Sequence, residues 1–159
     1  MKKEGVRPML NNDYIVGLVD GEGSFYVRLN TDKRRRNKVE LKFSLKLRHQ
    51  DKEILEQLKS FFDCGNIYIE RDKRPNHEIC YRFEVNNKKD IINKIIPFFE
   101  TNPPRIKSRS RDFELFKQIT NLSQKENLDL QLIQSLKEQM HWARSIRENR
   151  LYCGEPSSS

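Results

Sequence analysis

The 159-residue sequence lacks the features that define several classes of protein. No run approaches the roughly 18 to 20 apolar residues of a membrane helix, and the start, Met1-Lys2-Lys3-Glu4-Gly5, has no apolar core for a signal peptide. Its three cysteines, Cys64, Cys80 and Cys153, are far apart and lack the spacing of zinc ribbons or redox motifs. We therefore expect a soluble, intracellular protein with reduced thiols and no membrane partner.

The length suits one compact domain. We expect an N-terminal extension over 1–11, a single domain over 12–150 and a disordered tail over 151–159, where the residues are small and polar. The histidines at 49, 77 and 141 lack the spacing of a metal-binding motif, so zinc is not expected.

Positive charge is concentrated in one part of the chain. The sequence has 31 Lys and Arg against 23 Asp and Glu, a formal net charge of +8. Nine basic and two acidic residues fall between Arg28 and Arg48, a local balance of +7, so this segment carries nearly the whole excess. Such a patch attracts an anionic partner. A solvated face without a partner is the alternative, which the alternation of charged with apolar residues over 38–48 disfavours.

Alternation of apolar and polar residues predicts four strands in two hairpins. The odd positions of 38–48 are apolar and the even positions are mostly charged, which is the pattern of a long strand with one buried face. The same alternation predicts three more strands, over 25–30, 67–70 and 79–85.

Apolar residues at helical spacing predict a helix after each hairpin, over 54–62 and over 91–96, where Pro97 would end it. Two further helices are predicted over 112–120 and 128–147. The fold class is therefore α+β, with a four-stranded antiparallel sheet whose apolar face packs under the helices and whose polar face stays open.

The polar face of the predicted sheet suits duplex DNA. Eleven extended residues span roughly 36 Å, about one turn of B-DNA, and cations beside neutral donors can bind phosphates and read base edges. A sheet that binds RNA would need paired aromatic residues for stacking, and only Tyr26 and Tyr68 are expected to be exposed. The residues expected to contact DNA are Tyr26, Arg28, Asn30, Arg34, Arg35, Arg36, Lys42, Ser44, Lys46, Arg48, Tyr68, Glu70 and Arg82.

The segment 14–25 combines features that are unusual in a core helix. Gly17 and Gly21 lie four residues apart on one face, which would let a second helix approach closely. Asp20 and Glu22 lie at the C-terminal end, where the helix dipole disfavours a carboxylate unless a cation binds. If two such helices pack together, two Glu22 side chains would form an oxygen site suited to Mg²⁺.

The segment Ile15-Val16-Gly17-Leu18-Val19-Asp20-Gly21-Glu22-Gly23, followed by Ser24-Phe25, resembles the signature of the LAGLIDADG homing endonucleases. The fragments Asp51–Leu55 and Asp112–Lys117 also resemble the family, and the resemblance covers roughly residues 12–147. It implies an αββαββα fold with a saddle-shaped DNA-binding sheet.

The resemblance also implies a role for each motif residue. The family's last acid binds the metal, which assigns it to Glu22, and the backbone carbonyl before it, here of Gly21, adds a ligand. Gly17 and Gly21 would form the interface with a second helix, which Asp20 would brace by hydrogen bonding. Glu22 stands where Asp is commoner in the family, and its longer side chain reaches further with the same chemistry.

Two further catalytic residues are implied outside the motif. The family places a basic residue before its fourth helix, for which Lys107 is the first choice and Arg109 the second; a simple phosphate contact is the alternative for both. It also places a polar residue near the end of the second strand. Counting reaches Leu47, which does not fit, so Gln50 or His49 is the candidate.

The function implied is a Mg²⁺-dependent, intron-encoded endonuclease that makes double-strand breaks in a long, near-palindromic DNA site; other divalent cations could replace Mg²⁺. Because the sequence holds one motif and no internal repeat, we expect a homodimer. Two alternatives stay open on the same scaffold, a maturase that binds intron RNA and a DNA-binding regulator without catalysis. Abundant Lys, Asn, Ile and Phe are typical of an AT-rich genome, such as that of a mitochondrion or chloroplast.

Overall fold

The structure, a computed structural model, describes residues 9–71 and 74–140. Along this part of the chain the elements alternate between helices and paired strands. Their bounds, in chain order, are α1 (Asn12–Glu22), β1 (Gly23–Leu29), β2 (Val39–Arg48), the 3₁₀ turn η1 (His49–Asp51), α2 (Lys52–Phe62), β3 (Asn66–Glu70), β4 (Cys80–Val85), α3 (Lys88–Asp90), the π-helical segment η2 (Ile91–Ile95), α4 (Ile96–Thr101), α5 (Lys107–Ser123) and α6 (Leu130–Glu138).

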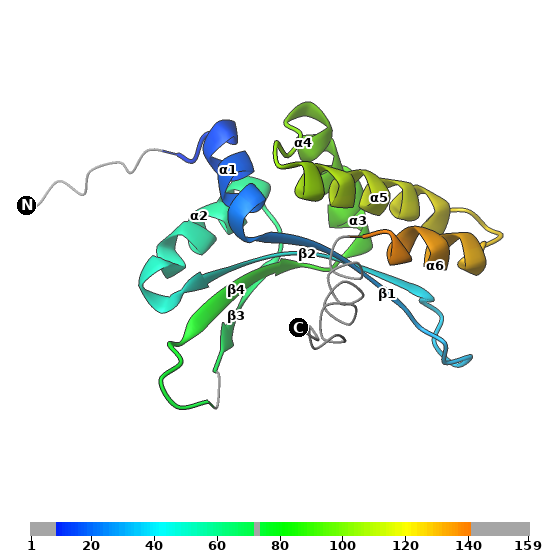
Figure 1. The fold of residues 1–159 in the computed structure, drawn as a ribbon, viewed down its shortest axis with the longest axis horizontal. Helices are drawn as coiled ribbons and strands as arrows, with labels where there is room; N and C mark the ends of the chain where they lie inside the picture. The colour runs from blue at the N-terminus through cyan, green and yellow to red at the C-terminus, as the bar shows by residue number, and fades with distance from the viewer. Residues whose placement is uncertain (1–8, 72–73, 141–159) are drawn as a thin grey trace, which may run out of the picture.

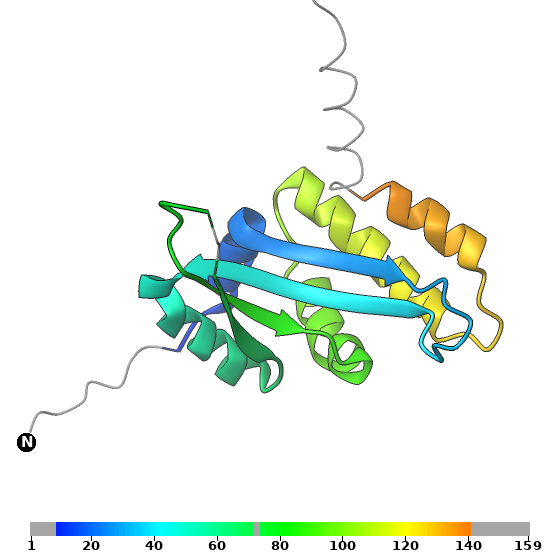
Figure 2. The same cartoon turned by 90° about the horizontal axis from the view of Figure 1, so that it is seen from below.

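The four strands form one antiparallel sheet in the order β1-β2-β4-β3. In Figure 1 the helices lie above an arched sheet, and Figure 2, seen from below, shows the other face of the strands uncovered by described helices. The α+β class and the four-stranded antiparallel sheet under helices are therefore confirmed. No helix among the described residues is long and apolar enough to cross a membrane.

Phenylalanine rings fix the sheet to the helices. The ring of Phe25 in β1 lies 5.3 Å from Phe43 of β2, 5.4 Å from Phe99 of α4 and 5.3 Å from Phe116 of α5, measured between centroids. All four side chains are fully buried. Packing of this density holds neighbouring elements in one arrangement. Because β1 follows α1 directly, it also fixes the end of α1 relative to the sheet.

Gly23 allows this direct connection. It ends α1 with an extended backbone, and a Cβ at this position would lie 2.7 Å from Cγ1 of Val19 and 2.8 Å from its carbonyl oxygen. A side chain here would force the strand away from the helix. The glycine therefore lets the strand begin immediately after Glu22.

Two predicted helices differ from the observed ones. Pro97 does not end the helix: α3, η2 and α4 follow one another without a break from Lys88 to Thr101, and Pro97 lies directly after the π-helical segment, where the hydrogen-bonding pattern changes. Helix α5 begins at Lys107, five residues before the predicted start at 112. The last helix, predicted over 128–147, is described as α6 over Leu130–Glu138; its remainder, and the predicted tail, lie outside the described residues.

Candidate metal centre and nucleic-acid interface

Helix α1 has one buried and one open side. Its N-terminus is capped by Asn11, whose Oδ1 accepts a hydrogen bond from the Tyr14 amide at 2.7 Å. Ile15 and Val19 lie in the core, whereas a Cβ added at Gly17 or Gly21 would meet no atom within 4 Å. The described residues of one chain thus leave the glycine side uncovered. The packing of a second helix there stays a prediction.

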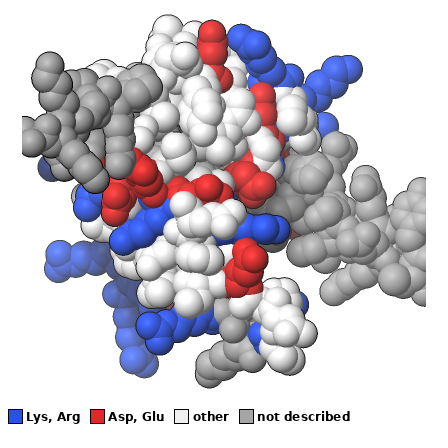
Figure 3. All heavy atoms as spheres, turned by 90° about the vertical axis from the view of Figure 1, so that its left-hand side faces the viewer, with Lys and Arg blue, Asp and Glu red and all other residues white. Residues whose placement is uncertain are grey.

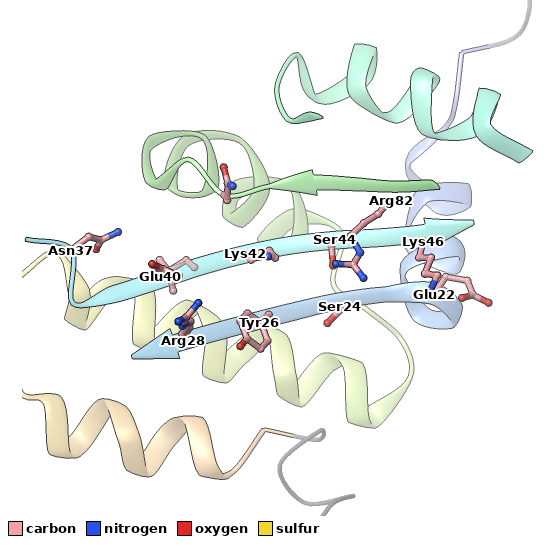
Figure 4. A pocket seen from close by; sticks show the side chains of 12 residues that line it. Glu22, Ser24, Tyr26, Arg28, Asn37, Glu40, Lys42, Ser44, Lys46 and Arg82 are labelled. Carbon is pink, nitrogen blue, oxygen red and sulfur yellow. The ribbon is translucent and has the colours of Figure 1, made fainter. Parts of the chain in front are cut away.

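Glu22 is the last residue of α1 and is exposed. It borders a hollow of about 640 Å³ on the polar face of the sheet, together with Ser24, Lys46 and Arg82. Figure 4 shows Glu22 and Lys46 at one end of this hollow and Glu40 toward the other. The helix therefore delivers a carboxylate to the edge of the open sheet face.

The donors at this end of α1 are of a kind that Mg²⁺ accepts. Within residues 9–71 and 74–140, no group of three or more His, Cys, Asp or Glu residues could hold a metal ion. One chain offers the Glu22 carboxylate and the Gly21 carbonyl, which lies in the last turn, where helix carbonyls have no helical partner. Because Mg²⁺ is commonly held by one or two carboxylates together with waters and substrate phosphates, a sparse oxygen set fits it.

Asp20 has a different setting from the one expected. Its carboxylate accepts hydrogen bonds from the Arg105 amide, at 3.1 and 3.2 Å, and from the Ile106 amide, at 3.3 Å. These amides precede α5, which has no side-chain cap of its own. Asp20 was expected to brace a pair of motif helices, but its observed hydrogen bonds join α1 to α5 within one chain. A role between two chains stays a prediction.

Lys107 and Arg109 lie in the first turn of α5, which Asp20 ties to the C-terminal half of α1. Lys107 is exposed, and Arg109 is half-buried, with an Nε atom that is buried and has no hydrogen-bond partner. The fold therefore brings both candidate cations toward the helix that ends at Glu22. Both stay candidates for the catalytic cation.

Gln50 does not lie beside Glu22. It belongs to η1 and borders a hollow that it shares with Asn11 and Tyr14, at the N-terminal end of α1. Glu22 ends the same helix, and 11 helical residues span roughly 16 Å. Gln50 lies just past β2, which ends at Arg48, and its assignment as the family's polar residue near the end of the second strand stays a prediction. His49 is exposed in the same turn.

The polar side chains of β2, β3 and β4 form a chain of ion pairs, which we call the ion network: Lys42, Glu84, Arg82, Glu70 and Lys46. Lys46 Nζ lies 2.8 Å from Glu70 Oε2, and Lys42 Nζ lies 3.3 Å from Glu84 Oε1. Arg82 pairs with both acids. Lys46 and Arg82 face each other in the strand register, so Glu70 bridges two cations that would otherwise repel.

Charge pairing changes the acid–base properties of this network. The hydrogen bond to Glu70 raises the pKa of Lys46 above its ordinary value. Burial works to raise the pKa of Glu70, but the hydrogen bond from Lys46 and the charge of Arg82 outweigh it, so that this pKa is lowered. The pairing therefore favours the charged forms of Lys46 and Glu70, and the three cations and two acids of the network largely cancel in formal charge.

Most other residues expected to contact DNA lie on the open face or in its loop. Arg28, Arg34, Arg35, Arg36 and Arg48 are exposed, and Tyr68 is 46% exposed. Tyr26 and Ser44 are half-buried and line the hollow. Figure 3, a view of the end that carries α1 and α2, shows Asp and Glu side chains interspersed with Lys and Arg side chains. The surface is thus mixed in sign away from the loop.

Asn30 departs from the expectation that it reads base edges. Its side chain is 8% exposed, and its Nδ2 donates to the Asn37 carbonyl at 3.0 Å and to Glu40 Oε1 at 2.8 Å. Both amide protons are therefore used within the chain. Glu40 and Glu84 were missed as site residues because the sequence was read for its cations. The signal was available, since both acids alternate with apolar residues on the polar face.

Comparison with known proteins agrees with this geometry. The family model described as LAGLIDADG endonuclease matches residues 15–120. The chain is 32% identical over 106 residues to the probable intron-encoded DNA endonuclease 1 of Mycosarcoma maydis. The matched segment covers 67% of this chain and 35% of that protein. The chain therefore belongs to the LAGLIDADG endonuclease family, as the motif predicted.

Two solved structures share the fold. I-SmaMI bound to an uncleaved DNA target in the presence of calcium ions aligns with a TM-score of 0.70 and 31% identity, over 84% of this chain and 45% of that one. The homing endonuclease I-TnaI aligns with a TM-score of 0.70 and 27% identity, over 89% of this chain and 99% of that one. The chain spans from 19% to 60% of the length of four curated relatives that it matches.

Proposed function

We propose that this protein is a site-specific DNA endonuclease that hydrolyses a phosphodiester bond in each strand of a long, near-palindromic target with Mg²⁺. The observation that carries the proposal is the position of Glu22, a carboxylate at the end of a helix that opens onto the polar face of a basic sheet. The DNA-bound structure of I-SmaMI and the intron-encoded endonuclease names of the relatives support it.

Glu22 and the Gly21 carbonyl would hold the metal. A bound divalent ion supplies Lewis-acid stabilisation of the phosphate charge and activates water. The strands lay the duplex along the sheet and fix the scissile phosphates near the end of α1. Lys107 or Arg109 adds positive charge there, which stabilises the developing negative charge during cleavage.

The working unit is a homodimer joined through α1. The open side at Gly17 and Gly21 supports this arrangement, since small residues let two helices meet closely. Each chain brings one Glu22, so two chains provide one carboxylate for each DNA strand. A two-fold axis between the helices explains a near-palindromic target.

The biological setting that we propose is intron homing. The relatives named intron-encoded endonucleases support it. Abundant Lys, Asn, Ile and Phe support an organellar gene, which would place the protein with mitochondrial or chloroplast DNA.

Selection of cleaved sites from a randomised duplex library, with Mg²⁺ present, tests this function. The expected result is one recurrent, near-palindromic sequence at the broken ends, absent when the metal is chelated. Broken ends without a shared sequence, or none above the no-protein control, would contradict the proposal. Specific binding to structured RNA without DNA cleavage would instead favour the maturase.

A further inference from the structure

The loop between β1 and β2 carries the densest positive charge of the chain. Residues 31–38, which we call the basic loop, contain five Lys or Arg and one Asp. Arg34, Arg35 and Arg36 are consecutive and exposed. Like charges this close repel one another, so the loop needs specific contacts to keep one conformation.

Contacts at the base of the loop supply this order. The Asn30 amide donates to the Lys38 carbonyl at 2.8 Å, and its Nδ2 donates to the Asn37 carbonyl at 3.0 Å. The second proton of Nδ2 goes to Glu40 Oε1 at 2.8 Å. One nearly buried side chain at the end of β1 thus holds both the far end of the loop and the start of β2.

Glu40 links the Asn30 side chain at the base of the loop to the nearby basic side chains. Its Oε1 lies 3.4 Å from Nη1 of Arg35, and Arg28 faces it directly across the strand pair. The hydrogen bond from Asn30 lowers the pKa of Glu40, with Arg28, Arg35 and Lys42 acting in the same direction against a smaller effect of burial. The carboxylate therefore stays ionised and keeps attracting the Arg35 side chain.

Asp32 completes the loop from within. Its Oδ1 accepts from the Arg34 amide at 2.9 Å, and its backbone carbonyl accepts from Nζ of Lys38 at 2.7 Å. These bonds close a turn at the start of the loop. The base of the loop, however, depends on Asn30 and Glu40.

We propose that Asn30 and Glu40 are positioning residues that hold the basic loop in one conformation, so that its arginines meet the phosphates of a DNA duplex without first having to be ordered. This role rests on the proposed DNA-binding function. Under this proposal Glu40 strengthens DNA binding. Charge counting alone predicts the opposite, because a negative charge in the most basic segment would repel an anion.

Hydrogen exchange in Asn30→Ala tests the ordering directly, without DNA. The substitution leaves the net charge unchanged and removes both side-chain donors. We expect the amides of 31–38 to exchange at least about tenfold faster, while those of α5 and the centre of β2 keep their rates. Unchanged exchange in the loop would overturn the proposal, whatever the protein does with DNA.

Three variants then test the effect on DNA by fluorescence anisotropy with a random-sequence duplex and no metal. Glu40→Ala and Glu40→Gln have the same charge, but only Gln keeps an oxygen that can accept from Asn30. Glu78→Ala is the control, since it removes an equally charged acid that pairs with Arg48 at 3.4 Å outside the loop.

The proposal predicts that Glu40→Ala binds DNA at least about threefold more weakly than the native protein, with a shallower salt dependence, and that Glu40→Gln is intermediate. Glu78→Ala should bind more tightly, as charge counting requires. Equal tightening in all three variants would overturn the positioning role. Failure of the native protein to bind any duplex would instead overturn the proposed function, and with it this role.

Discussion

The basic loop and the ion network lie on the same open face but handle charge in opposite ways. The loop carries five cations, four of them exposed, with a single acid among them. In the network, three cations share two acids, at distances such as 2.8 Å between Lys46 and Glu70 and 3.3 Å between Lys42 and Glu84. The two regions are joined through β2, which supplies Lys42 and Lys46 to the network and Glu40 to the base of the loop.

This difference indicates two modes of DNA contact. Exposed cations bind phosphates and release counterions, a contribution that does not depend on sequence. Paired cations attract phosphates weakly, but their donors are fixed in direction, and fixed donors and acceptors are what base edges require. We therefore expect the loop to supply affinity and the network to supply specificity.

Removal of the three loop arginines should have the largest effect on binding. Replacement of Arg34, Arg35 and Arg36 by Ala is expected to weaken binding to every duplex by at least roughly a hundredfold and to lower the salt slope by about 2 to 3 for each chain of the dimer, because each phosphate contact adds close to one unit. Titration at several salt concentrations measures both quantities.

A matched control removes the same charge from the helical side. Lys59, Lys89 and Lys125 are exposed in or beside α2, α3 and α5. Their replacement by Ala should leave the salt slope nearly unchanged. An equal loss in both triple variants would mean that net charge, rather than the loop, sets affinity.

Arg82→Ala should have a smaller effect on affinity and a larger one on specificity. It removes the cation that Glu70 and Glu84 share, so we expect a loss of roughly 1 to 3 kcal/mol at one or two base pairs of the target, with little change on random DNA. Binding to a panel of single-base variants measures this. Arg48→Ala, outside the network, should instead weaken the binding of all duplexes alike. The reverse pattern would contradict the assignment of affinity to the loop and specificity to the network.

Asp20→Ala should change the stability of the fold more than it changes DNA binding by the basic loop or the ion network. It removes the acceptor for two amides before α5, so we expect about 1 kcal/mol less stability in thermal or denaturant unfolding. Asp20→Asn keeps one acceptor oxygen and should lose less. If both variants unfold like the native protein, these hydrogen bonds do not hold α5 against α1.

The fold was largely predictable because alternation over many residues fixes a strand. The predicted strand over 38–48 matches β2 to within one residue. Asn11 and Gly23, which cap the two ends of α1, are residue types that favour these positions. Pro97 was misread because a helical run can continue past a proline where its hydrogen-bonding pattern changes, here from the π-helical η2 to α4, and the sequence does not reveal that change.

The candidate site was predictable where residues are neighbours in the motif and less so where the fold brings distant residues together. Glu22 lies where the motif places it, at the edge of the sheet. The bonds of Asp20 to residues 85 and 86 positions away, and the ion pairs across β2, β4 and β3, depend on tertiary register. Alternation placed Asn30 on the polar face but could not show that the loop covers it.

The central claim, that Glu22 serves cleavage rather than binding, is tested by Glu22→Gln on the selected target with Mg²⁺. The account predicts binding within about threefold of native and cleavage reduced by at least about a thousandfold, because the amide cannot replace the metal-binding carboxylate. Glu56→Gln, on the outer side of α2, is the control and should cut like the native protein. Native-like cleavage by Glu22→Gln would contradict the account.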